Sequence, residues 1–485
     1  MSPSRHTTEA YAFDRLFLDG TWVAPSTSET FDIRSPHDGS AVGSAPIASE
    51  SDVDRAVEGA RRAFDHGPWS RMTVEQRIGA LRPFVDAYAT RTAELAVLVT
   101  SEMGSPATFS EPAHGIGPLV LMQATLEFAE SYPWIERRGT SMLIREPAGV
   151  VGVITPWNVP QVTMLAKVLP ALVAGCTVVV KPAPETPLDA MLLAGLLADA
   201  DLPPGVVAVL PGATSTGRRL VEHPGVDRIA FTGSADVGRT IASICGKRLA
   251  RCSLELGGKS AAIVCEDASL ERTVAGLRFS SFLNNGQACV AQSRILAPRS
   301  RYDEVAQALA EAADGFVVGD PNDPATDIGP LVSARQRERV RGYIDVGVAE
   351  GATLVAGGSD PIDGLDGGQY VRPTVFRDVD NSMRIAREEI FGPVIVVIPY
   401  DDIDDAVAIA NDSPYGLGGS VWTKDRAAGL AVARRVRTGM FGINSFAPEF
   451  GVPFGGFKAS GIGREYGPEA FDEYVEMKSV YGVPA

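Results

Sequence analysis

The chain has 485 residues, of which 45% are hydrophobic and 21% charged, a composition typical of a globular protein of about three domains. Its 44 basic and 60 acidic residues give a formal net charge of −16, which disfavours a nucleic-acid surface because phosphate backbones attract basic patches. No apolar run is long enough to predict a transmembrane helix, and residues 1–9 lack the apolar stretch of a signal peptide.

The cysteines indicate a reducing compartment. They are odd in number and show no C-x-x-C spacing, so neither a disulfide framework nor a zinc site is expected. We therefore expect a cytoplasmic protein that takes no metal and has neither nucleic acid nor membrane as a partner. The cysteines are Cys176, Cys245, Cys252, Cys265 and Cys289.

In chain order, the first expected element is a β-hairpin at residues 16–23, where an Asp-Gly pair separates two short apolar stretches. Residues 50–131 are expected to be helical, because their apolar residues recur at three- and four-residue spacing. Short β-branched runs then alternate with helix-length segments, which predicts a buried parallel sheet with right-handed crossovers. The expected strands are residues 150–154, 177–180, 206–210, 228–231 and 261–264.

A second alternating stretch follows residue 289 and predicts a second α/β domain. Ligands of parallel sheets bind at the carboxyl ends of the strands, and a cleft between two domains is a common place for an active site. The strand-like segments are 293–297, 394–398 and 417–422, and the helix-like segments are 302–313, 403–411 and 426–436.

Cys289 and Glu255 are the first candidate catalytic residues. Cys289 lies in Asn-Asn-Gly-Gln-Ala-Cys-Val, and Glu255 lies in Leu-Glu-Leu-Gly-Gly-Lys-Ser. A thiol with one carboxylate is the minimum set for covalent attack followed by hydrolysis. A Cys–His pair of the protease type would have to take its base from the first half of the chain, because every histidine precedes both motifs. The histidines are His6, His37, His66, His114 and His223.

Polar or glycine-rich segments follow three of the expected strands. Asn158 comes after residues 150–154, Lys181 after residues 177–180, and Gly233-Ser234 after residues 228–231. The free N–H groups of a helix that opens at Ser234 suit a pyrophosphate, and Lys181 suits a ribose hydroxyl or a phosphate. Each residue alone also fits an ordinary structural role, such as a tight turn, so only the set indicates a function.

Together these residues, in this order and spacing, resemble the aldehyde dehydrogenase superfamily. The resemblance continues through Glu-Glu-Ile-Phe-Gly-Pro (388–393) and Pro-Phe-Gly-Gly-Phe-Lys-Ala-Ser-Gly (453–461) and covers nearly the whole chain. It implies an α/β fold with two doubly wound domains and a small β oligomerisation element. The implied cofactor-binding domain is 1–130 with 149–257, the catalytic domain is 258–460, and the oligomerisation element is 131–148 with 472–485.

The resemblance also implies a reaction and its catalytic residues. Cys289 would attack an aldehyde, while Asn158 and the backbone N–H of Cys289 would stabilise the oxyanion. After hydride transfer, Glu255 would activate the water that hydrolyses the thioester, and Glu465 would relay protons. Relatives that pass the acyl group to coenzyme A typically lack the glutamate at position 255, so we expect release of a free carboxylic acid.

For the cofactor, the resemblance implies a nicotinamide dinucleotide. Many members of the superfamily have a glutamate at the position of Pro184, where it grips the adenosine ribose, and here the glutamate is displaced to Glu185. We therefore expect NAD as the first choice, with NADP as the alternative. The implied cofactor-binding residues are Ile154, Thr155, Trp157, Lys181, Glu185, Gly233, Ser234, Leu256, Glu389 and Phe391.

The expected substrate pocket contains Val159, Ala166 and Phe454. The first two match positions that are aromatic in relatives acting on small aliphatic aldehydes, so a medium-sized apolar or aromatic aldehyde is expected. No arginine occupies the pocket positions that the resemblance identifies, which weighs against a semialdehyde carboxylate.

Two alternatives to this function are a cysteine-dependent hydrolase or acyltransferase without a nucleotide, and a non-catalytic binding relative. The resemblance further implies a homodimer or homotetramer, joined through the oligomerisation element.

Overall fold

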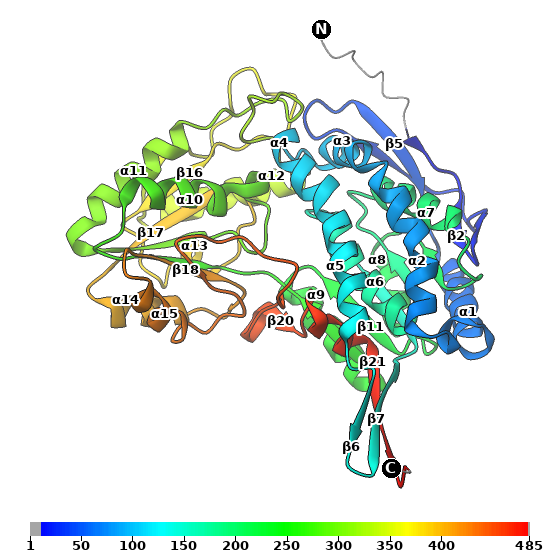
Figure 1. Cartoon of the computed structure of the whole chain (residues 1–485). Coiled ribbons are helices and arrows are strands. Elements are labelled where there is room, and N and C mark those ends of the chain that lie inside the picture. The colour runs from blue at the N-terminus through cyan, green and yellow to red at the C-terminus, as the bar shows by residue number, and fades with distance from the viewer. Residues whose placement is uncertain (1–10, 484–485) are drawn as a thin grey trace.

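The computed structural model describes residues 11–483 and contains two large sheets, each covered by helices on both faces (Figure 1). The α/β fold expected from the sequence is confirmed. Residues 1–10 and 484–485 lie outside the described range. The prediction that residues 1–9 are not a signal peptide, and the outer ends of the predicted domains, concern these residues and are not described.

The first sheet has eight strands within residues 11–483, in the order β20-β12-β11-β8-β9-β10-β2-β3. Five of them, β12 to β10 in that order, run parallel, while β20, β2 and β3 join the edges in antiparallel fashion. The strands are β2 (Leu16–Leu18), β3 (Thr21–Val23), β8 (Val150–Ile154), β9 (Thr177–Lys181), β10 (Val207–Val209), β11 (Arg228–Thr232), β12 (Arg251–Glu255) and β20 (Gly461–Ile462).

The predicted hairpin at residues 16–23 is confirmed as β2 and β3. Asp19 and Gly20 form its turn with φ angles of 49° and 74°, the left-handed conformation that Asp-Gly adopts in tight hairpins. The strand order places β8 and β11 side by side although β9 and β10 lie between them in sequence. Such a reversal of strand order is the point at which doubly wound sheets bind ligands.

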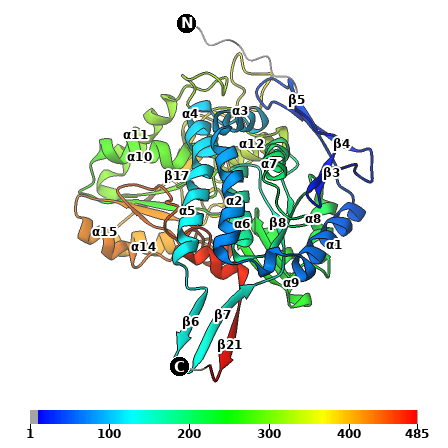
Figure 2. The ribbon, with the colours of Figure 1, turned by 45° about the vertical axis from the view of Figure 1, so that its right-hand side comes forward.

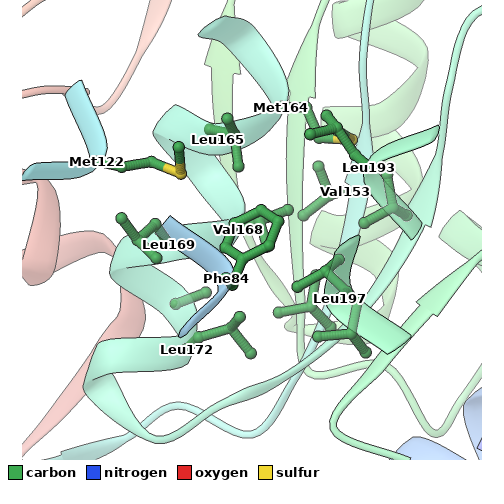
Figure 3. Packing of buried hydrophobic residues seen from close by; sticks show 14 of the residues in the cluster. Phe84, Met122, Val153, Met164, Leu165, Val168, Leu169, Leu172, Leu193 and Leu197 are labelled. Atoms are coloured by element: carbon green, nitrogen blue, oxygen red, sulfur yellow. The ribbon is translucent and has the colours of Figure 1, made fainter. Parts of the chain in front are cut away.

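Alternate side chains of the buried strands contact different helix layers. Val151 and Val153 of β8 pack against helices α2, α5, α6 and α7, whereas Val150 and Ile154 pack against α1, α8 and α9. Figure 3 shows Phe84 of α2 surrounded by apolar side chains of α6 and α7. The helices are α1 (Glu50–His66), α2 (Val74–Ala89), α3 (Thr92–Met103), α4 (Ala107–Ser110), α5 (Gly117–Ser131), α6 (Pro160–Ala174), α7 (Leu188–Asp199), α8 (Thr214–Glu222) and α9 (Ala235–Arg248).

The second sheet has seven strands within the described residues, in the order β15-β16-β17-β14-β13-β18-β19, and only β15 is antiparallel to its neighbour. Helices α10 and α11 cover one face and α12, α14 and α15 the other. The strands are β13 (Ala261–Val264), β14 (Arg294–Pro298), β15 (Thr353–Ala356), β16 (Thr374–Arg377), β17 (Val394–Tyr400), β18 (Gly419–Trp422) and β19 (Gly442–Ile443). The helices are α10 (Leu270–Phe282), α11 (Tyr302–Asp314), α12 (Ala334–Ala349), α13 (Arg384–Arg387), α14 (Ile403–Asn411) and α15 (Arg426–Ala433).

Two smaller sheets complete the fold. One consists of β1 (Tyr11–Ala12), β4 (Thr30–Arg34) and β5 (Ala41–Pro46). The other consists of β6 (Ile135–Arg138), β7 (Ser141–Pro147) and β21 (Val475–Tyr481), and it projects from the body as an arm (Figures 1 and 2). This arm coincides with the predicted oligomerisation element, whose role stays a prediction, as do the domain boundaries. Between residues 11 and 483, no helix combines the length and apolar character needed to cross a membrane.

Candidate active site

A cavity of about 850 Å³ lies between the two large sheets and is lined by residues of both. It brings together most of the side chains that the sequence analysis selected. The predicted residues that line it are Trp157, Asn158, Val159, Gly233, Ser234, Glu255, Leu256, Cys289, Glu389, Phe391, Phe454 and Glu465.

The register of the first sheet explains why these residues meet. Ile154 of β8 pairs with Lys181 of β9 on one side and with Phe231 of β11 on the other, so the carboxyl ends of these strands are level. Thr232 of β11 in turn pairs with Glu255, the last residue of β12. The sequence analysis did not predict β12, because Arg-Cys-Ser-Leu-Glu has no continuous β-branched run. Its presence places Glu255 at the same sheet edge as the other polar groups.

The nucleotide end of the cavity lies at the N-terminus of α9. Ser234 caps this helix, and its hydroxyl accepts a hydrogen bond from the N–H of Val237 at 3.4 Å. Ala235 and Asp236, in the first turn, also line the cavity, and N–H groups of a first turn have no partner within the helix. Such groups bind phosphate, so this end of the cavity fits the pyrophosphate of a dinucleotide.

Aromatic and acidic side chains lie farther along the same cavity. Trp157 and Phe391 contact each other edge to face with ring centroids 5.4 Å apart, and Phe391 has a positive φ of 63°. The Glu389 carboxylate accepts a hydrogen bond from the N–H of Gly258 at 3.0 Å, and burial raises its pKa to about 7. A Cβ at Gly257 would lie 2.1 Å from this carboxylate, so the paired glycines allow the close approach.

Five predicted site residues do not line the cavity: Ile154, Thr155, Ala166, Lys181 and Glu185. Lys181 is buried one strand away, and burial lowers its pKa to about 8. Glu185 is paired with Arg335 at 3.2 Å, and Arg335 does line the cavity. Ala166 is buried in the apolar core and does not line the cavity. It lies on the same face of α6 as Val162 and Thr163, which do line it, but one turn farther along the helix.

The loop before Cys289 holds an unusual backbone. Asn284, Asn285 and Gly286 have consecutive φ angles of 53°, 62° and 72° in the left-handed region, which asparagine and glycine adopt most readily. The Asn285 side chain is fully buried and compensates with three hydrogen bonds: its oxygen accepts from the N–H of Gly329, and its amide donates to the carbonyls of Gly104 and Pro330. This loop is therefore fixed from several sides, which holds the residues after it in place.

Asn158 joins this loop to the first sheet. One N–H of its side-chain amide donates to the carbonyl of Gln287 at 3.0 Å, and the Asn284 amide donates to the backbone carbonyl of Asn158 at 2.8 Å. A side-chain amide carries two N–H donors, so one remains for a ligand in the cavity beside Cys289.

The thiol and the carboxylate lie in a weakly solvated environment. Burial, and then the carboxylates of Glu389, Glu255 and Glu465, raise the pKa of Cys289 to about 12. Burial and the neighbouring Glu465 also raise the pKa of Glu255 well above its ordinary value, and neither Glu255 oxygen has a hydrogen-bond partner among the described residues. A buried, unpartnered carboxyl group with a raised pKa is suited to accept and return protons.

Glu465 is paired with Lys167, a residue that the sequence analysis missed. The Lys167 ammonium also donates to the hydroxyl of Thr232 at 2.6 Å and to the carbonyl of Thr163 at 3.1 Å, and its side chain is only 1% exposed. The sequence does contain a feature that could have identified Lys167: it is the one charged residue in the otherwise apolar stretch Met-Leu-Ala-Lys-Val-Leu. Buried lysines need partners, so such a residue predicts a nearby carboxylate.

Apolar and aromatic side chains form the end of the cavity beyond Cys289. Val159 and Phe454 belong to this wall, and Phe454 is hydrogen-bonded to Glu465 through both backbone groups. The wall residues that the sequence analysis did not select include Phe109, Val162, Phe279, Phe446, Phe450 and Tyr466. They come from distant segments, which no local motif connects.

The fold and the cavity define an α/β protein with a cysteine and a carboxylate in one cavity between two sheets. Residues 22–480 match the aldehyde dehydrogenase family. Geranial dehydrogenase of Castellaniella defragrans is 46% identical over 471 residues, which are 96% of this chain and 98% of that protein. The chain therefore belongs to the aldehyde dehydrogenase family, as the sequence resemblance predicts.

Solved structures agree with this assignment. A Mycobacterium tuberculosis aldehyde dehydrogenase complexed with NAD+ superposes with a TM-score of 0.96 at 48% identity, covering 98% of this chain and 99% of that one. A mutant of aldehyde dehydrogenase C from Pseudomonas syringae, in complex with NAD+ and octanal, superposes with a TM-score of 0.95 at 40% identity, covering 100% of this chain and 99% of that one.

Proposed function

We propose that this protein oxidises an aldehyde to the free carboxylic acid with NAD+ as electron acceptor. One aldehyde, one water and one NAD+ give one carboxylate, one NADH and two protons. The observation that carries the proposal is the placement of Cys289 and the unpartnered Glu255 in one cavity with a helix N-terminus suited to a pyrophosphate.

In the first step, the sulfur of Cys289 bonds to the aldehyde carbon, and the carbonyl π electrons move to the oxygen. Because its pKa is raised to about 12, the thiol is protonated near neutral pH and must lose its proton as it attacks. Glu255 is the acceptor that we assign. Asn158 contributes the free amide N–H that stabilises the new oxyanion, together with the backbone N–H of Cys289.

NAD+ supplies a hydride acceptor when it is bound. We assign its pyrophosphate to the first turn of α9, and its nicotinamide half to the region of Glu389 and Phe391. Loss of the hydride converts the alkoxide into an acyl thioester on Cys289. The chain's contribution to this step is to hold the adduct and to exclude water.

Before the second step, Glu255 passes the proton that it took from the thiol on towards solvent and becomes a carboxylate again. In the second step, it removes a proton from a water molecule, whose oxygen attacks the thioester carbon and expels the Cys289 thiolate. The buried Glu465–Lys167 pair lies beside Glu255, and we assign to it the passage of the released proton towards solvent. The product is a carboxylate, because water is the nucleophile.

For the substrate, we propose a medium-sized apolar or aromatic aldehyde. The wall built by Val159, Phe446, Phe450 and Phe454 supports this class, because it offers apolar surface and no cation. The names of similar proteins point the same way, since one is a geranial dehydrogenase and another was solved with octanal.

NAD is our proposed cofactor, with NADP as the alternative. The NAD+ complexes of similar proteins support the first choice. Arg335, which is paired with Glu185, supports NADP as the alternative. It lines the cavity, and an arginine is the kind of cation that binds the 2′-phosphate of NADP. Steady-state rates with both cofactors at matched concentrations decide between them.

We also propose a cytoplasmic homo-oligomer, a homodimer or a homotetramer, assembled through the arm of β6, β7 and β21. The exposed Ile135, Met477 and Tyr481 on this arm support the proposal, as do its two unpaired sheet edges. Light scattering of the purified protein measures the assembly.

The test of the reaction follows NADH absorbance with decanal or benzaldehyde. Cys289→Ala should abolish turnover, with a loss on the order of 10⁴-fold or more, because no other nucleophile replaces the sulfur. Glu255→Gln should give a burst of about one NADH per active site and then stall at the thioester. Wild-type protein that forms no NADH with any aldehyde would contradict the proposal, and hydrolysis of a thioester in the absence of nucleotide would favour a hydrolase.

A further inference from the structure

A second cavity, of about 360 Å³, lies beside the active-site cavity. It is formed by one side of α10, the segment after β18 and residues 444–447. Phe279, Phe446 and Ala447 line both cavities, so the two share a wall at the apolar end of the active site.

The second cavity is lined by three cationic side chains and by no carboxylate. The cations are Arg272 of α10, Lys424 after β18, and Arg426 at the start of α15. This composition contrasts with the whole chain, whose formal charge is −16. A local concentration of positive charge in an acidic protein attracts anions to that place.

These three cations are also unpaired. Within residues 11–483, none of their side chains has a hydrogen bond or an ion pair, whereas Arg278 on the same helix is paired with Asp327 at 2.9 Å. Among the acids nearby in sequence, Asp267 and Asp425 are used elsewhere, and Glu271, next to Arg272, does not line the cavity. Asp267 accepts from the Thr423 hydroxyl and from backbone N–H groups of residues 424 and 425, and Asp425 caps α15.

Helix α10 sets the spacing between the two cavities. Phe279 faces both, and Arg272 lies seven residues earlier, which corresponds to about 10 Å along a helix that rises ~1.5 Å per residue. Gly276 lies between them, and a Cβ there would come within 2.0 Å of the Trp422 indole, so the glycine lets this ring form the floor. A chain that runs from Cys289 past Phe279 therefore reaches the cations only if it is long.

We propose that the second cavity binds the anionic far end of the substrate, so that the enzyme oxidises long-chain aldehydes with a terminal carboxylate. The aldehyde meets Cys289, the apolar chain lies along the aromatic wall, and the carboxylate lies among Arg272, Lys424 and Arg426. The product is then a dicarboxylate. This inference rests on the proposed reaction and replaces its substrate class with a longer aldehyde that is apolar near the thiol and anionic at its far end. The pocket positions near the thiol, which lack an arginine, do not include the three cations.

The experiment compares three substrates of equal chain length: ω-oxodecanoate, its methyl ester and decanal. Wild-type enzyme should have a kcat/KM about tenfold higher for the oxo acid than for either neutral aldehyde, the gain expected from two or three partly exposed charge pairs. The advantage should shrink as salt is raised, because exposed charges are screened. In the double variant Arg272→Gln/Lys424→Gln, the oxo acid should lose about this tenfold advantage, mainly through a higher KM.

Arg434→Gln/Lys247→Gln is the matched control, since both residues are exposed, neither lines the cavity, and the pair of substitutions removes the same two charges. It should keep the wild-type preference. An equal loss in this control would mean that the net charge, and not the cavity, selects the substrate, and would overturn the inference. Wild-type enzyme that oxidises decanal without preferring the oxo acid would overturn the inference alone, whereas no NADH from any of the three aldehydes would overturn the proposed function.

Discussion

The two large sheets contribute to the active site in different ways. The eight-stranded sheet supplies groups from the ends of strands whose register is fixed by backbone ladders, as with Thr232 opposite Glu255. The seven-stranded sheet supplies Cys289 from a loop between α10 and β14, held by buried asparagine side chains and three left-handed residues. A strand end is positioned by the sheet itself, whereas a loop needs hydrogen bonds from its surroundings to reach the same precision.

Despite this difference, both sheets place their candidate catalytic group in a similar electrostatic environment. Glu255 is buried without a hydrogen-bond partner at a rigid strand end, so burial and Glu465 keep its pKa high. Burial raises the pKa of the Cys289 thiol as well, and the loop places it near the carboxylates of Glu389, Glu255 and Glu465, which raise it further. The catalytic pair thus depends on both regions staying in contact.

Breaking the contact between the two regions should have the largest effect. Asn158→Ala removes both the bond to the Gln287 carbonyl and the free N–H that we assign to the oxyanion. We expect kcat to fall about 10²- to 10³-fold, the usual cost of one oxyanion donor, as measured by NADH formation with decanal. The dissociation constant of NAD+ should stay within about twofold, and a loss confined to NAD+ binding would contradict the role of Asn158.

Weakening the loop alone should have a smaller effect. Asn285→Ala leaves the Gly329 N–H and two carbonyls without their partner and places alanine at a φ of 62°. We expect a loss of roughly 3 kcal/mol in unfolding free energy, because buried unsatisfied groups cost ~1–3 kcal/mol each. Denaturation with urea measures it. Asn322→Ala, in an exposed turn, is the control and should change stability by less than about 0.5 kcal/mol.

Removing the charge of Glu465, which lies beside Glu255 at the end of β12, should have the smallest effect of the three changes. It tests whether a neighbouring charge sets the pKa of the group that the first sheet supplies. Glu465 raises the pKa of Glu255, and its partner Lys167 lowers it, so Glu465→Gln should lower the pKa of Glu255. Because the carboxylate form activates water, thioester hydrolysis should then begin at lower pH than in wild type. The pH profile of single-turnover hydrolysis measures the shift, which should be about one pH unit.

Glu449→Gln is the control for this experiment, because Glu449 is exposed and does not line the cavity. Its profile should match that of the wild type. A profile of Glu465→Gln that is unchanged or moved to higher pH would mean that Glu465 does not act on Glu255 through its charge.

Most of the first sheet follows from sequence patterns. The runs at 150–154, 177–180 and 228–231 are confirmed as β8, β9 and β11, because buried parallel strands are rich in apolar residues, many of them β-branched. β12 was missed because it is polar at its start, and Ala166 was assigned to the pocket although it faces the core. The direction in which a helical side chain points depends on how the helix packs, and no motif encodes that.

The sequence by itself determined the family and the order of the motifs, and it selected Cys289, Glu255 and Asn158 as the candidate catalytic residues. It could do so because the set of motifs is specific, although each residue alone also fits a structural role. Only the tertiary structure decided which side chains form an ion pair, lie along one path for protons or line the same cavity. Lys167 and Glu465 lie far apart in sequence, as do Arg272 and Lys424. Their proximity depends on strand register and helix packing, which set the distances between charged groups and therefore the charge of each cavity.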